Sequence, residues 1–171
     1  MPPSLQIALA ATVLAAAGSD LATRRIPNWI TVPGAALGLA LHGYHEGFPG
    51  ALSSLAGAGL GFSIFFVLYL AGGMGAGDVK LYGAVGALVG PQALTLVFVL
   101  TGILGGIAAV ALASARGRLR ETLAQTGQLM LSFGRLRWVE AHQASSLDAP
   151  GALRLPYGAV IAGGVLLFLA L

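Results

Sequence analysis

Uncharged apolar segments of membrane-spanning length recur along this chain, separated by short polar segments. A helix needs roughly 20 apolar residues to cross the hydrocarbon core of a bilayer. The 35 residues from Leu81 to Ala115 carry no charge, yet as one helix they would rise about 52 Å against a core of about 30 Å, and Gly90-Pro91 favours a break. We therefore predict six membrane-spanning helices, over residues 4–19, 28–43, 51–72, 78–89, 93–114 and 156–171.

The composition places the chain among integral membrane proteins. Hydrophobic residues make up 57% and charged residues 9%, with a mean hydropathy of +0.86, whereas a soluble domain carries about 25% charged residues. The chain has no cysteine, which excludes a disulfide framework and a thiolate zinc site. The predicted fold is an all-α, polytopic membrane helix bundle forming one domain over residues 1–171.

The nine basic residues predict the orientation of this bundle. With six spans every Lys and Arg falls on one side, which should be the cytoplasm, because cytoplasmic loops carry an excess of basic residues. We expect both termini to face outward and the protein to lie in the inner (cytoplasmic) membrane. The basic residues fall into three groups: Arg24 and Arg25; Lys80; and Arg116, Arg118, Arg120, Arg135, Arg137 and Arg154.

Residues 116–155 form the longest segment outside the predicted spans. Apolar residues alternate with arginines here, which favours a cytoplasmic amphipathic helix on the anionic lipids of the inner leaflet, although a solvated loop is the alternative. Three carboxylates also lie in this loop, those of Glu121, Glu140 and Asp148. They allow a second interpretation, in which the loop binds a basic peptide or controls access to an active site.

Two of the six carboxylates occupy the ends of predicted spans. Asp20 ends the first, and Asp78 follows a glycine-rich turn, Gly75-Ala76-Gly77, before the fourth. Ionised carboxylates are costly at a bilayer and therefore point to a function. Two aspartates held together can share one proton and activate water for peptide hydrolysis. The predicted topology places both at the cytoplasmic face.

Each of these residues also has a purely structural interpretation. Asp20 and Arg24 are four residues apart and could form an ion pair at a helix end, and Asp78 could be the N-cap of the fourth span. Arg24 and Arg25 could be topology anchors or catalytic groups, and Lys80 could anchor the topology or raise the positive potential near the aspartates. Pro27 and Asn28 most simply begin the second span.

Histidines and aromatic residues give weaker signals. His42 and His45 flank an outer turn far from the aspartates, where no third ligand completes a metal site. Trp29, Trp138 and Tyr157 suit the membrane interface, and glycines should allow close packing of helices, as at Gly57, Gly61, Gly102 and Gly106. We expect no cofactor, no metal and no nucleic-acid partner.

Three segments resemble the type IV prepilin peptidases, which are GxGD aspartyl membrane proteases. Residues 20–28, with the sequence DLATRRIPN, are similar to the segment around the family's first catalytic aspartate, and residues 75–80, GAGDVK, to its second motif. Pro156-Tyr157-Gly158 resembles the start of the family's last membrane helix. The order and the 58-residue spacing of the two aspartates also fit this family.

The resemblance implies an aspartic endopeptidase that removes basic leader peptides from pilin-like precursors at the cytoplasmic face. Asp20 and Asp78 would be catalytic, with Gly75, Gly77, Arg24, Pro27, Asn28 and Lys80 supporting them. The large members also methylate the new N-terminus and carry a long, zinc-binding cytoplasmic segment after the first span. Here about eight residues occupy that place, so the chain resembles the compact members and methyltransferase activity is not expected.

Two other classes of function compete with this one. Presenilin-like or signal-peptide-peptidase-like GxGD proteases place their aspartates on consecutive spans, whereas two predicted spans intervene here. A small transporter could use buried carboxylates for ion passage, but it would favour carboxylates at mid-span and an internal repeat. Neither feature occurs in the sequence.

Overall fold

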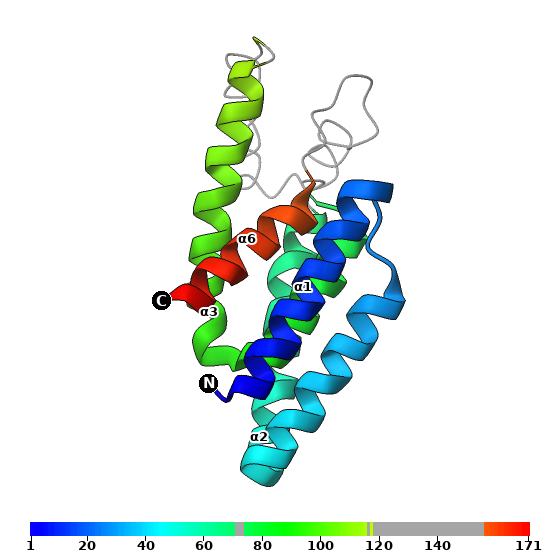
Figure 1. Cartoon of the computed structure of the whole chain (residues 1–171), viewed down its shortest axis with the longest axis vertical. Helices are drawn as coiled ribbons and strands as arrows, with labels where there is room; N and C mark the ends of the chain where they lie inside the picture. The colour runs from blue at the N-terminus through cyan, green and yellow to red at the C-terminus, as the bar shows by residue number, and fades with distance from the viewer. Residues whose placement is uncertain (71–73, 116, 118–155) are drawn as a thin grey trace.

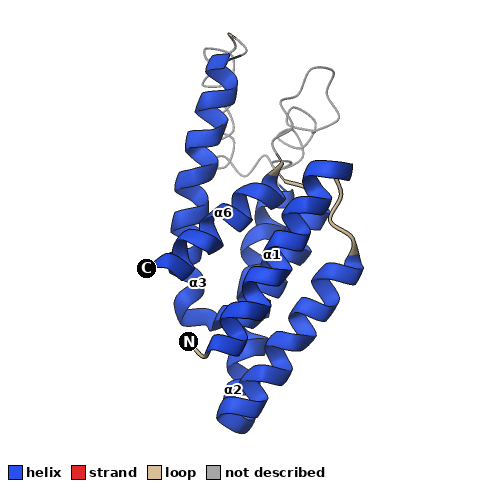
Figure 2. Cartoon of the chain, viewed as in Figure 1, coloured by secondary structure: helices blue, strands red, loops and turns tan. Residues whose placement is uncertain are grey.

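The computed structural model describes residues 1–70, 74–115, 117 and 156–171, and this part of the chain is helical without any strand (Figures 1 and 2). The predicted all-α fold is therefore confirmed for the described residues. The predicted amphipathic loop, with Trp138, Glu121, Glu140 and Asp148, lies outside them. The helices are α1 (Pro3–Thr23), α2 (Asn28–Leu70), α3 (Ala76–Ala115) and α6 (Tyr157–Ala170).

Glycines with positive φ divide α2 and α3 into two helical halves each. Gly47 has φ 66° and ψ −149°, inside the polar segment predicted as a turn. Gly90 has φ 75° and ψ 168°, directly before Pro91, which confirms the predicted break. Residues with a Cβ rarely adopt such a conformation. As a result each helix folds back on itself (Figure 1).

The first half of α3 is the central helix of the bundle. Residues 78–90 are all buried except Lys80, as expected for a helix surrounded by other helices. Glycines let α2 approach this half closely, because a Cβ added to Gly57 would lie 2.2 Å from the Gly86 carbonyl oxygen, and one added to Gly61 would lie 2.5 Å from the Tyr82 oxygen. The predicted packing role is confirmed at Gly57 and Gly61.

The same expectation is wrong for Gly102 and Gly106 within the described structure. A Cβ at either position would meet no described atom within 4 Å. These glycines lie in the second half of α3, which extends beyond the rest of the bundle (Figure 1). Glycines of the two helices therefore differ in role: Gly57 and Gly61 of α2 face the enclosed first half of α3, whereas Gly102 and Gly106 lie on its less enclosed second half.

A single buried stripe on α1 faces the bundle. Its members recur at helical spacing and comprise Leu5, Leu9, Thr12, Val13, Ala16 and Asp20. Helix α6 packs against both α1 and α3, and it crosses between them in Figure 1. Asp20 thus continues an apolar face, and its carboxylate is directed toward the neighbouring helices.

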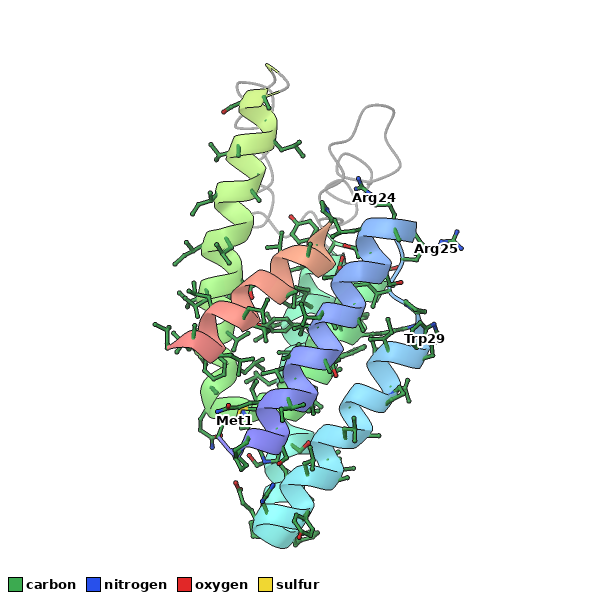
Figure 3. The ribbon with its side chains drawn as sticks, viewed as in Figure 1. Met1, Arg24, Arg25 and Trp29 are labelled. Carbon is green, nitrogen blue, oxygen red and sulfur yellow. The ribbon has the colours of Figure 1, made fainter. Side chains whose placement is uncertain are left out.

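The ends of the bundle differ in chemistry. Arg24 and Arg25 lie at one end and Met1 at the other, with Trp29, the second residue of α2, on the arginine side (Figure 3). Trp29 is 72% exposed, and Tyr44, near the hairpin of α2, is 85% exposed. By length and composition α1, α2 and α3 are apolar enough to cross a membrane.

Candidate active site

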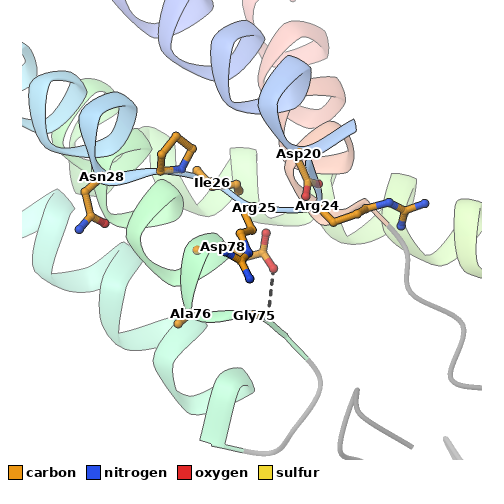
Figure 4. Close-up of a pocket in the computed structure, with 10 residues that line it drawn as sticks. Asp20, Arg24, Arg25, Ile26, Asn28, Gly75, Ala76 and Asp78 are labelled. Atoms are coloured by element: carbon orange, nitrogen blue, oxygen red, sulfur yellow. Dashed lines mark hydrogen bonds between the residues drawn. The ribbon is translucent and has the colours of Figure 1, made fainter. Parts of the chain in front are cut away.

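A pocket of about 470 Å³ opens at the arginine end of the bundle, and both aspartates face it (Figure 4). The end of α1, the α1–α2 linker and the start of α3 form its walls. The lining residues are Asp20, Arg24, Arg25, Ile26, Pro27, Asn28, Gly75, Ala76, Gly77 and Asp78. The structure thus gathers seven of the eight sequence-predicted site residues around one space, and Lys80 is the exception.

Asp20 reaches the pocket from the last turns of α1. Its side chain is only 8% exposed, and its Oδ2 accepts a hydrogen bond from the backbone N–H of Gly158 at 2.9 Å. Gly158 is the second residue of α6, where backbone N–H groups have no partner within the helix. The Asp20 carboxylate therefore accepts a hydrogen bond from an N–H group of α6 that has no partner within its own helix.

Asp78 lies in the first turn of α3 and is also 8% exposed. Its Oδ2 accepts a hydrogen bond from the backbone N–H of Gly75 at 3.1 Å, shown dashed in Figure 4. The helix begins at Ala76, so Asp78 is its third residue and not the N-cap that one interpretation predicted. A carboxylate at the third position that bonds back to the residue before the helix corresponds to half of a capping box.

The two carboxylates line the same pocket, and Tyr157 lies at the start of α6, next to the Gly158 that donates to Asp20. Each carboxylate is held at a helix N-terminus, where the helix dipole favours a negative charge. Tyr157 was predicted to lie at the membrane interface, and in the structure its side chain is half-buried against the protein.

Ile26 fills the space between the starts of α3 and α6. A Cβ added to Gly77 would lie 3.2 Å from Ile26 Cβ, and a Cβ added to Gly158 would lie 3.1 Å from Ile26 Cδ1. The second glycine of the GxGD sequence is therefore in close contact with the α1–α2 linker. Ile26 and Gly158 were not predicted as site residues, because an apolar side chain and a backbone N–H carry no chemical signature of their own. The signal that could have identified them is their place in two segments that resemble the family, residues 20–28 and 156–158.

The linker has a fixed geometry. Arg24 ends α1 with φ 56°, a left-handed conformation that is uncommon for a residue with a side chain, and its N–H donates to the Asp20 carbonyl at 2.8 Å. The carbonyl of Arg25 accepts hydrogen bonds from Ser19 Oγ at 2.9 Å and Thr23 Oγ1 at 3.3 Å. These bonds orient the chain between the first aspartate and α2.

Lys80 acts outside the pocket lining. Its ammonium group donates to Asn28 Oδ1 at 3.1 Å and so joins the first residue of α2 to α3. The bond connects α2 and α3 next to the pocket, which Asn28 lines.

The two described histidines, His42 and His45, lie away from Asp20 and Asp78. His42 is buried and hydrogen-bonded through Nε2 to the Leu88 carbonyl at 3.1 Å, and His45 Nε2 lies 2.9 Å from Ser4 Oγ. Among the described residues no three His, Cys, Asp or Glu side chains come together as a metal site.

Comparisons with known proteins place this chain in a family. Residues 7–110 match the model of the type IV leader peptidase family. Over 106 residues the chain is 35% identical to a "Prepilin leader peptidase/N-methyltransferase" of Neisseria gonorrhoeae, an alignment that covers 58% of this chain and 37% of that relative. No solved structure matches the chain. The match covers the α1–α2 linker and the start of α3, and the chain belongs to the type IV leader peptidase family of aspartic-type membrane peptidases.

Proposed function

We propose that this protein is an endopeptidase that removes the basic leader peptide from type IV pilin-like precursors at the cytoplasmic face of the inner membrane. One observation carries this proposal: Asp20 and Asp78, 58 residues apart in sequence, line one pocket in a chain that belongs to the leader peptidase family. The substrate class comes from the name of the gonococcal relative, whose full length this chain covers only in part.

The paired carboxylates support hydrolysis by an activated water. One aspartate, ionised, takes a proton from water while the oxygen attacks the carbonyl carbon of the scissile peptide. The other, protonated, donates a hydrogen bond to the carbonyl oxygen, which becomes negative in the tetrahedral intermediate. The C–N bond then breaks, a proton passes to the leaving amine, and one water has been added across the bond. The pair exchanges its protons as a unit.

The supporting residues have separate roles in this proposal. Gly77 permits the linker to reach the start of α3, and Gly75 provides the N–H that holds Asp78. Arg24 ends α1 so that the chain can turn into Pro27.

We further propose six membrane crossings within a single domain, one for each helical half of α2 and α3 together with α1 and α6. The described Lys and Arg residues are Arg24, Arg25 and Lys80, and they lie at the pocket end, which supports a cytoplasmic active site. Trp29, at the start of α2, and Tyr44, near its hairpin, are both largely exposed, as expected for aromatic side chains at the two membrane interfaces.

The competing functions are not favoured. Family membership and the pocket together support leader peptidase activity over a presenilin-like or signal-peptide-peptidase-like activity. A transporter is less consistent with carboxylates at the end of a bundle, because an ion path needs polar groups near its middle.

The proposal is tested by incubating purified protein in detergent with a pilin precursor and following leader removal by mass. Asp20→Asn and Asp78→Asn should each abolish cleavage with little change in thermal stability. Glu46→Gln is the matched control, since it makes the same chemical change at an exposed carboxylate in the hairpin region of α2. Substantial cleavage by either aspartate variant would refute the catalytic pair, and labelling of Asp20 and Asp78 on opposite faces would refute the topology.

A further inference from the structure

The first turn of α6 contacts the first aspartate through the chain backbone. Gly158 N–H donates to Asp20 Oδ2 at 2.9 Å across a separation of 138 residues. The neighbouring N–H groups of Ala159 and Val160 are instead bonded to the Pro156 carbonyl, at 3.0 and 3.3 Å. The Gly158 donor is thus directed out of α6 toward the catalytic pair.

Only glycine fits at this position. An added Cβ would lie 2.9 Å from Asp20 Cβ, 3.0 Å from Asp20 Oδ2 and 3.1 Å from Ile26 Cδ1. The first of these atoms is fixed by the backbone of α1 and cannot rotate away. Any side chain at position 158 would therefore have to move α6 away from α1 or turn the Asp20 carboxylate out of its hydrogen bond.

We propose that Gly158 is the positioning residue of Asp20: its N–H fixes the orientation of the carboxylate, and its lack of a side chain makes this contact possible. The inference rests on the proposed function. The N–H groups in the first turn of a helix have fixed directions and no partner within the helix, so the hydrogen bond from Gly158 holds the carboxylate in one orientation. The last helix thereby sets the geometry of the aspartate on the first.

Gly158→Ala tests the proposal, with Gly163→Ala in the same helix as the matched control. A Cβ at Gly163 would meet only Leu104 Cδ1, the flexible end of a side chain, at 3.3 Å. We expect Gly158→Ala to lower kcat by about 10- to 100-fold, because a misplacement of about 1 Å in a catalytic group has effects of this size. KM for precursor should change less than about threefold, since binding contacts remote from the bond are retained.

The separate effects on kcat and KM distinguish positioning from general packing. Alanine at position 158 keeps the backbone N–H but displaces it from Asp20, so Gly158→Ala should lower kcat with KM almost unchanged, whereas Gly163→Ala should leave both in place. If Gly158→Ala matches Gly163→Ala in kcat and KM while Asp20→Asn is inactive, the positioning role is refuted and the proposed function stands. If Asp20→Asn retains activity, the proposed function fails first.

A second pair of variants keeps the test informative if Gly158→Ala does not fold. Ile26→Val removes only Cδ1, which would lie 3.1 Å from an added Cβ at position 158, so Gly158→Ala in the Ile26→Val background has more room than in the natural sequence. The double variant is compared with Ile26→Val alone. The same drop in kcat with KM almost unchanged would support the proposal, and equal kinetics in the two would overturn it.

Discussion

Gly57→Ala should impair both stability and catalysis, although it lies far from the pocket. The new methyl would lie 2.2 Å from the Gly86 carbonyl oxygen and 3.0 Å from backbone carbons of Gly86 and Gly90, whereas ordinary contact begins at 3.4 Å. Backbone atoms cannot rotate away, so α2 and α3 must separate by about 1 Å at this point. Overpacking of this kind costs about 1–3 kcal/mol, which corresponds to a fall in Tm of roughly 5 °C for a chain of this size.

The catalytic effect follows from the position of Gly86 on the central helix. Asp78 lies eight residues earlier, about 12 Å along the same buried segment. A displacement of about 1 Å transmitted to Asp78 should lower kcat by about 10- to 100-fold. The assay is leader removal from a pilin precursor in detergent, together with thermal unfolding of the same preparation.

Gly59→Ala is the control, because a Cβ at Gly59 would meet nothing within 4 Å among the described residues. It should leave stability unchanged or raise it by up to about 1 kcal/mol through helix propensity. Gly57→Ala with the Tm and kcat of Gly59→Ala would refute the argument that backbone contact between α2 and α3 positions the second aspartate.

Three further outcomes are expected. Tyr82→Phe should keep or raise the Tm, because it removes a buried hydroxyl that has no described hydrogen-bond partner. The stacking of the ring on Phe65, with centroids 3.9 Å apart, is retained. A loss of activity would instead show that the hydroxyl takes part in the reaction. Lys80→Met should lower stability by no more than about 1 kcal/mol in thermal unfolding, because its bond to Asn28 is exposed. Cleavage should survive metal chelators and thiol reagents in an inhibitor series, and recovery of a chelated sample by zinc would contradict the two-aspartate mechanism.

The sequence predicts the helix breaks and the pair of aspartates well, for physical reasons. Gly47 and Gly90 adopt backbone conformations that only glycine adopts readily, and prolines at 49 and 91 follow them closely. Charge is equally informative, because a carboxylate in an apolar segment is costly and therefore conspicuous. The prediction that Asp20 and Asp78 converge drew on the spacing of these features and on the family resemblance.

The remaining features depend on contacts that have no signal in one chain. The bond from Gly158 to Asp20 involves a backbone donor that every residue except proline possesses. Ile26 resembles any other apolar residue, and only its position between Gly77 and Gly158 makes it part of the site. The different surroundings of Gly86 and Gly102 likewise follow from the enclosure of only the first half of α3 by the other described helices, and helical spacing cannot distinguish the two halves.

The shortness of the central helical segment has a consequence for the surrounding lipid. Residues 76–89 rise only about 21 Å before the break at Gly90, whereas a hydrocarbon core measures about 30 Å. A helix of this length cannot reach both headgroup regions of a bilayer of ordinary thickness. Either one of its ends lies below the membrane surface, or the bilayer is thinner around it. We therefore expect Asp78 to work beneath the level of the phosphates, in a depression filled with water, and a precursor to be cut there without leaving the lipid phase completely.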